Sequence, residues 1–426
     1  MPRLPRPFVM LLIAVVAVRV GVVTWSAIGR VRGDFYASMP GAYVETLNPQ
    51  LWNSPDMTDA WGYHRDTYFH GPVQYLTLYP VALLDSFGSI AAVLLPVYAV
   101  LLAAAFWLMW RVAKRLGASH DLLVPLFATT FLFLPLLQAY LQREFEVVVL
   151  AGLSGALLLL LNDRRGPAAA LLAYVAWFKY IPLLYAGYLL LRRWWRELAV
   201  FASVSVAVLI LSEALFGLWR FFNNNVPAHA AQAFTVWGFD FRWGATGHLH
   251  GTGFCDGWVD AQTSLANVRY GLCTLASRHA WIHPPLIYLG LCGAIAAFYL
   301  RMQVLLDRHS APALEDRRRA IEFSIVTAVC ACFVFGHYYY LIVLIIPFNV
   351  LLVLYSGERR GGALALWAIA YFMVGAFVVP VGMLSRISGH DVWALFIRHS
   401  VFLYGELLLM GLLLNEYRRL AAATRV

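Results

Sequence analysis

An acidic residue follows the first apolar run of the chain, where that run gives way to polar sequence. This residue is Asp34, in the stretch Gly33-Asp34-Phe35-Tyr36, where an aromatic ring follows it directly. A carboxylate that is partly desolvated at a membrane boundary has a raised pKa, which suits a general base. Asp66 and His70 lie in a second aromatic stretch of the same polar region, so Asp66 is the alternative base. A loop carboxylate can also be simply solvated.

A lysine interrupts a later apolar run, in Trp177-Phe178-Lys179-Tyr180-Ile181-Pro182. Only two of the 32 basic residues are lysines, Lys114 and Lys179. A cation within a membrane segment is costly and faces a cavity or a partner. A phosphate group at the membrane boundary would satisfy Lys179. The structural alternative is a salt bridge to an intramembrane acid such as Glu213 or Glu406.

Two further polar groups lie beside apolar runs. Arg143 and Glu144 belong to the turn QREFE at 142–146, where the arginine could hold a phosphate and the acids could orient hydroxyl groups. The same charges could instead neutralise one another. His337 and Tyr338 begin the stretch HYYY at 337–340. An imidazole can bind phosphate or relay a proton, and the tyrosines can stack on a sugar or form an aromatic belt.

The composition indicates which elements must position these residues. Of 426 residues, 61% are apolar and only 13% are charged, against about 45–50% and about 25% in soluble domains. A water-soluble fold of this size cannot bury so much apolar surface. We therefore predict an all-α polytopic membrane protein, which excludes soluble enzymes, fibrous and disordered chains and disulfide scaffolds. The net charge of +9 belongs mainly to loops at the inner leaflet and does not indicate nucleic-acid binding.

The apolar runs predict about twelve transmembrane segments between residues 8 and 416. The first, about 8–28, resembles a signal peptide, but Arg19 interrupts it and no small-residue cleavage site follows, so we expect an uncleaved helix. Segment 166–192 breaks at Pro182, which predicts two short helices that form a hairpin. The proposed inner loops then hold roughly twice as many Arg and Lys residues as the outer loops, as the positive-inside rule requires.

This topology divides the chain into five parts. They are a first transmembrane helix (1–28), a first extracytoplasmic loop with juxtamembrane helices (29–88), a transmembrane module (89–218), a second long extracytoplasmic loop (219–280) and a C-terminal transmembrane module (281–426). Segments of polar sequence as long as these two loops usually carry function.

The five cysteines contain no CxxC pair of the kind that binds metals. Cys255 and Cys273 both fall in the second long loop, facing an oxidising compartment, where they could form a disulfide or remain free. The other three lie in predicted helices, where a buried apolar thiol is the simplest interpretation.

Four stretches carry a resemblance to a known family. They are GDFY with Asp34, YFHGPVQYLTLYPVALL before the second span, WFKYIPLLYAGYLLLRRWW at the helix break, and FGHYYYLIVLIIP at a late span. In order and topology these stretches resemble the GT-C glycosyltransferases, particularly the polyprenyl-phosphate-sugar-dependent mannosyl- and arabinofuranosyltransferases of family GT87. The chain departs from the family pattern at His70-Gly71-Pro72, where a double proline is usual, and at the turn Gln142-Arg143-Glu144.

The resemblance implies a GT-C fold of about twelve spans in the cell membrane, with the active site on the extracytoplasmic face. Asp34 would be the general base of an inverting transfer from a polyprenyl-phosphate sugar to a glycolipid or polysaccharide hydroxyl. Lys179, His337 and Arg143 would stabilise the phosphate leaving group. No cofactor and no obligatory metal are expected. The substrate pocket would include Tyr36, Asp66, His70, Glu144 and Tyr338.

Two other classes of membrane protein compete with this interpretation. Helix breaks and intramembrane charges also suit a transporter or a flippase of lipid-linked sugars. Transporters commonly show internal repeats and short loops, whereas this chain has no evident repeat and two long outer segments. An oligosaccharide polymerase or ligase commonly has a large late outer loop but lacks the early acidic one.

Overall fold

The computed structural model is helical apart from one short antiparallel pair of strands. It describes residues 6–29, 73, 76–77, 80, 87–142, 146–179, 184–216, 241–243, 249–251, 268–279, 281–308, 314–333, 338–375, 381–390, 392, 395–396 and 399–423. The α-helices are α1 (Arg6–Gly29), α5 (Phe87–Arg115), α6 (Leu123–Phe131), α7 (Leu134–Gln142), α8 (Glu146–Leu161), α9 (Arg165–Lys179), α10 (Leu184–Leu191), α11 (Trp195–Phe216), α13 (Val268–Ala276), α14 (Pro284–Arg308), α15 (Glu315–Phe333), α16 (Ile345–Gly357), α17 (Gly361–Val374), α18 (Val381–Ser388) and α20 (Val401–Ala423). Two 3-10 helices, η4 (His120–Leu122) and η7 (Tyr338–Leu344), and the paired strands β1 (Phe241–Trp243) and β2 (Leu249–Gly251) complete the described elements.

Every apolar run predicted from the sequence contains a helix, which confirms an all-helical membrane protein at this level. By length and apolar composition, three helices of the described part could each cross a membrane, namely Ala92–Arg115, Pro284–Arg308 and Tyr340–Gly357. The run 122–140 is instead a pair of helices, bent by 59° between Phe131 and Leu134, and would be a fourth span if counted as one. The total of about twelve spans stays a prediction.

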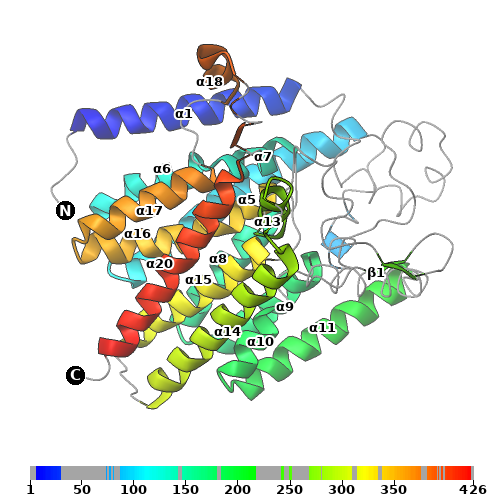
Figure 1. The fold of residues 1–426 in the computed structure, drawn as a ribbon. Helices are drawn as coiled ribbons and strands as arrows, with labels where there is room; N and C mark the ends of the chain where they lie inside the picture. The colour runs from blue at the N-terminus through cyan, green and yellow to red at the C-terminus, as the bar shows by residue number, and fades with distance from the viewer. Residues whose placement is uncertain are drawn as a thin grey trace.

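Figure 1 shows α8 and α15 in the middle of the helices, with α16 and α17 on one side and α9, α10 and α11 on the other. Nearly all side chains of α15 and α16 are buried, although α15 begins with five charged residues in its first six positions. The first helix, α1, runs across one end of α6 and α7 and contacts both.

Helices α8 and α9 form a tight antiparallel pair because small residues let their backbones approach. A Cβ added at Gly152 would lie 2.3 Å from Val175 Cγ2, and one added at Gly155 would lie 3.2 Å from Leu171 Cδ2. Interfaces with small residues of this kind are typical of membrane helices. The turn between the two helices places Asp163 in the left-handed region, with φ of 57°.

Ion pairs join the turns at one end of the bundle, which we call the charged end. The pairs are Arg115–Asp316, Arg319–Asp163, Arg192–Glu315, Arg318–Asp307, Arg317–Glu358 and Arg360–Glu416. Asp163 precedes α9 and Arg192 follows α10, so the α9–α10 pair starts and ends at the charged end, as a hairpin does. These are the loops that the charge distribution assigns to the inner side of the membrane.

Candidate active site

The end of the bundle opposite the charged end gathers several of the predicted stretches. Helix η7, which begins at Tyr338, contacts α7 and α8. Helix α7 ends at Gln142 and α8 begins at Glu146, so these two ends of QREFE and the start of η7 lie at the same end of the structure. Their sequence positions are almost 200 residues apart, and the packing of η7 against α7 and α8 is what joins them.

The helix break with Lys179 lies at this end as well. The contacts of Gly152 with Val175 and of Gly155 with Leu171 set the antiparallel register of α8 and α9. This register brings Lys179, the last residue of α9, level with the first turn of α8. The break therefore lies far along the bundle from the Arg319–Asp163 pair at the charged end.

Thr77, in the stretch before the second span, contacts α9. The Thr77 hydroxyl donates to the Val73 carbonyl at 2.7 Å, and Thr77 Oγ1 lies 2.6 Å from the hydroxyl of Tyr174. Val73 is fully buried. Lys179 and the start of η7 lie at the α7–α8–α9 end of the bundle, and Thr77 contacts α9 at Tyr174.

The individual side chains predicted for the site lie mostly outside the described residues. These are Asp34, Tyr36, Asp66, His70, Arg143, Glu144, His337 and Cys255. Lys179 and Tyr338 have a described backbone at the ends of α9 and η7, but their side chains are not described. Their assignment to catalysis, phosphate binding or the sugar pocket stays a prediction.

Glu146 is a buried carboxylate at this end. It is the last residue of the QREFE turn and the first of α8, and only 3% of it is exposed. The partial positive charge at a helix N-terminus favours a carboxylate there. It belongs to the motif QREFE, in which Glu144 is the predicted pocket residue.

Two further buried charges lie on elements of the second half of the chain. Glu406 on α20 is 1% exposed, and neither of its carboxylate oxygens has a hydrogen-bond partner in the described part of the chain. It lies near Cys332, close to the end of α15 that leads toward His337. The Glu406–Lys179 pair, the structural alternative for the lysine, stays untested because the Lys179 side chain is not described.

Arg269 is a buried cation within the predicted second extracytoplasmic loop (219–280). It lies on α13, is 4% exposed and faces Tyr288 of α14. Helix α13 contacts α14, α15 and α20. The signal that could have found it is the apolar spacing of Val268, Leu272 and Leu275, which predicts a short helix with one buried face.

The described cysteines comprise one disulfide-bonded residue and three free thiols. Cys273 is disulfide-bonded, and Cys292, Cys330 and Cys332 are free thiols. The remaining cysteine is Cys255, which lies outside the described residues and stays the predicted partner of Cys273. Among the residues that the structure describes, no group of three or more His, Cys, Asp or Glu side chains could hold a metal ion.

Comparison with known proteins gives one match. The sequence model of glycosyltransferase family 87 matches residues 68–314, which is more than half of the chain. No curated protein matches the chain, and no solved structure does. The matched range includes the stretch before the second span, the QREFE turn and the helix break with Lys179, and it excludes Asp34 and His337.

Proposed function

Because the chain belongs to glycosyltransferase family 87, and is therefore a membrane glycosyltransferase, we propose that it uses a polyprenyl-phosphate sugar as its donor. The sugar would be mannose or arabinofuranose, and the acceptor a hydroxyl group of a glycolipid or polysaccharide. The reaction would take place on the extracytoplasmic face of the cell membrane.

The observation that carries this proposal is the separation of two ends of the bundle. The charged end collects the arginine-rich loops, which the positive-inside rule places in the cytoplasm. The break after Lys179 and the start of η7, which belong to two stretches of the family resemblance, lie at the other end, which would then face outward. A lipid-linked donor suits such a site, because its polyprenyl chain stays in the membrane while its phosphate lies at the surface.

The proposed step forms one bond and breaks one. An acceptor hydroxyl attacks the anomeric carbon of the sugar from the side opposite the phosphate, so that the configuration inverts. Asp34 takes the hydroxyl proton, and the bond from the anomeric carbon to the phosphate oxygen breaks. Lys179, with His337 and Arg143, would stabilise the negative charge that develops on the departing polyprenyl phosphate. No cofactor or metal enters this scheme.

The sugar pocket in this proposal would be formed by polar and aromatic side chains. Carboxylates and histidines would orient sugar hydroxyls, and tyrosine rings would stack on the sugar face. The proposed pocket residues are Tyr36, Asp66, His70, Glu144 and Tyr338. Buried Glu146 lies at the end of the bundle that carries the candidate site. It is a further candidate for a carboxylate that accepts hydrogen bonds from sugar hydroxyls.

A transfer assay tests the proposal. Purified protein is incubated with radiolabelled polyprenyl-phosphate mannose and, separately, with polyprenyl-phosphate arabinose, in the presence of a membrane glycolipid extract. Label that moves into a new glycolipid would support the proposal and identify the sugar. If neither donor is consumed and the lipid-linked sugar instead crosses vesicle membranes that contain the protein, the proposed donor reaction is wrong.

A further inference from the structure

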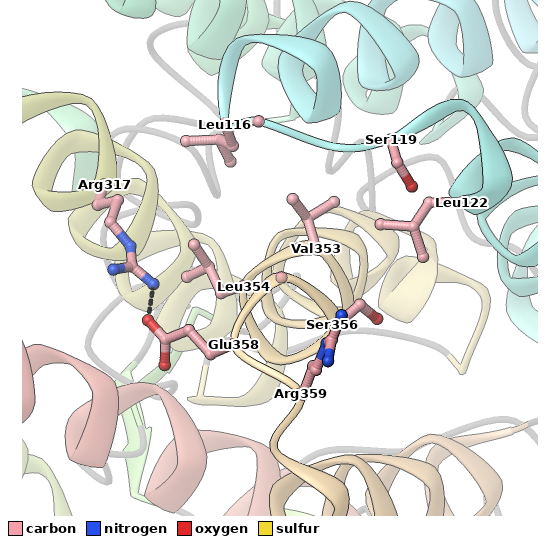
Figure 2. A pocket seen from close by; sticks show the side chains of 11 residues that line it. Leu116, Ser119, Leu122, Arg317, Val353, Leu354, Ser356, Glu358 and Arg359 are labelled. Carbon is pink, nitrogen blue, oxygen red and sulfur yellow. Dashed lines mark hydrogen bonds and ion pairs between the residues drawn. The ribbon is translucent and has the colours of Figure 1, made fainter. Parts of the chain in front are cut away.

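A cavity of about 400 Å³ opens at the charged end, between the α5–η4 connection, the start of α15 and the end of α16. Figure 2 shows Leu116, Leu122 and Val353 around it, and the Arg317–Glu358 ion pair at one side. On the other side lie Ser356 and Arg359, next to each other at the end of α16. The cavity is thus apolar on part of its wall and charged at its rim.

Arg359 differs from the arginines around it in having no acidic partner in the described part of the chain. Arg317, Arg360 and Arg419 all approach Glu358, so the single carboxylate at this rim is already matched by three cations. Arg359 itself is exposed, and the turn holds its backbone at φ of 54°. The rim therefore keeps a positive charge that is available to an anion.

Ser356 supplies a second, independent observation. It is 4% exposed and contributes to the wall of the cavity. Its hydroxyl oxygen has no hydrogen-bond partner among the described residues, although serines in helices commonly donate to the carbonyl four residues earlier, as Ser154 and Ser205 do here. A buried hydroxyl without a partner is unfavourable and rare. An acceptor atom within the cavity would satisfy it.

We propose that this cavity binds a phosphate ester, with Arg359 as the pairing cation and the Ser356 hydroxyl as a donor. Guanidinium groups pair well with phosphate oxygens. The aliphatic wall formed by Leu116, Leu122 and Val353 would contact the glycerol and the first methylenes of a phospholipid. Such a site lies at the end opposite the proposed active site, and it does not depend on the proposed donor or acceptor.

Native mass spectrometry of the delipidated full-length protein tests the site. The probes are phosphatidylglycerol, diacylglycerol with the same acyl chains, and inorganic phosphate. We expect phosphatidylglycerol to bind at least about tenfold more tightly than diacylglycerol, because the latter lacks the charged group. Retention of inorganic phosphate would identify a free anion as a sufficient ligand, and retention of phosphatidylglycerol alone would identify a lipid. Equal binding of phosphatidylglycerol and diacylglycerol would overturn the proposal.

The chain offers a matched control for Arg359. Arg193 is also exposed, also has a positive φ (55°), and lies in the α10–α11 turn at the charged end, but it does not line the cavity. We expect Arg359→Gln to weaken binding of the phosphate probe about tenfold and Arg193→Gln to leave it unchanged. Equal losses in the two variants would mean non-specific attraction to the charged end, which contradicts a defined site.

The variant Ser356→Ala distinguishes an effect on ligand binding from an effect on the stability of the fold. The substitution removes an unsatisfied hydroxyl, so the melting temperature of the delipidated protein should stay the same or rise. The increase in melting temperature that phosphatidylglycerol produces in the native chain should shrink. A variant whose lipid-dependent increase matches that of the native chain would exclude Ser356 as a donor.

Discussion

Arg319 of α15 donates from Nη1 to Asp163 Oδ1 at 2.7 Å, and the same nitrogen donates to the Leu160 carbonyl at 2.7 Å. One buried arginine therefore fixes the α8–α9 turn to a helix more than 150 positions later in the chain. Its guanidinium carbon also lies 6.0 Å from the centre of the Trp194 ring, so the α10–α11 turn is held at the same place. This contact is the physical link that closes the α9–α10 hairpin at the charged end.

The Arg319–Asp163 ion pair should make the stability of the fold depend on pH in the acidic range. The hydrogen bond from Arg319, which outweighs the opposing effect of burial and is aided by the charges of Arg319 and Arg165, holds the pKa of the Asp163 carboxyl below its usual range. A carboxyl whose pKa is lower in the folded than in the unfolded chain stabilises the fold at any pH above its unfolded-state pKa, which is about 3.9. This stabilisation is lost as the pH falls through the folded-state pKa. The melting temperature of Asp163→Asn should therefore lie below that of the native chain at neutral pH, and the difference should shrink as the pH falls below the unfolded value of about 3.9. A constant difference at every pH would contradict this assignment.

The position of the charged end relative to the membrane can be tested by labelling. Arg196 is exposed in the first turn of α11, and Arg386 is exposed on α18. In intact cells, a membrane-impermeant maleimide should label Arg386→Cys and should label Arg196→Cys only after permeabilisation. The native chain supplies the background, because its described free thiols are the partly buried Cys292 and the buried Cys330 and Cys332. Labelling of Arg196→Cys from outside would mean that the α9–α10 hairpin, and the topology after it, has the opposite orientation to the one predicted.

Removal of the Glu322 carboxylate should greatly lower the stability of the fold. It is fully buried, and its Oε1 accepts from Arg318 Nε at 2.8 Å and from the Tyr417 hydroxyl at 2.6 Å, while Oε2 lies 3.4 Å from Arg192 Nε. Glu322→Ala leaves two buried guanidinium groups without this acid, which should cost about 3–5 kcal/mol. Thermal melting in detergent measures it. Tyr417→Phe removes only one hydrogen bond and should cost about 1–2 kcal/mol, so the order of the two variants stays informative if the first unfolds.

The arrangement of helices along the chain was predictable, and their lengths were less so. Apolar runs predict the helices because a membrane segment has to satisfy its own backbone. The run 122–140 has a uniform apolar composition, yet it bends by 59° after Phe131. The Leu134 amide there donates to the carbonyl of Gly375, at the end of α17. Pro135 in the first turn of α7 is a local signal for a break, but a bond between residues so far apart leaves no such signal.

The charged residues also separate what the sequence predicts from what it does not. Counting arginines by loop predicted which turns share a side, but not which acid each arginine pairs with, because Arg192 and Glu322 meet only through tertiary packing. Burial of Glu406 and Arg269 depends on α13, α15, α17 and α20 coming together. The motifs of the candidate site were recognisable because their residue types are unusual for an apolar segment. Their side-chain geometry stays a prediction.

Asp34 is the residue on which the proposed chemistry depends most. A general base contributes about 10²–10⁴-fold to the rate, so Asp34→Asn should lower kcat by at least about a hundredfold while donor binding and melting temperature stay close to native. Asp56→Asn, in the same polar region, is the matched control and should retain activity. If Asp34→Asn turns over at a rate close to native and Asp66→Asn does not, the base is Asp66.

Lys179 and Lys114 form an internal comparison, because they are the only lysines of the chain. Lys179 ends α9 at the candidate active site, whereas Lys114 lies near the end of α5 at the charged end, with its ammonium 5.5 Å from the centre of the Trp110 ring. If Lys179 binds the donor phosphate, Lys179→Ala removes a charged hydrogen bond and should raise the KM for the lipid-linked donor about 10- to 100-fold. The KM for the acceptor and both constants of Lys114→Ala should stay near native.

The structural alternative gives a different pattern for the same variants. If Lys179 instead neutralises Glu406, Lys179→Ala leaves a buried carboxylate without its cation and lowers the melting temperature, with little change in the donor KM. Adding Glu406→Gln should then restore much of the lost stability, because the unpaired charge is gone. A donor KM that rises in Lys179→Ala and stays high in the double variant, with a melting temperature close to native, favours the phosphate. These two measurements therefore decide whether the lysine at the helix break binds substrate or maintains the fold.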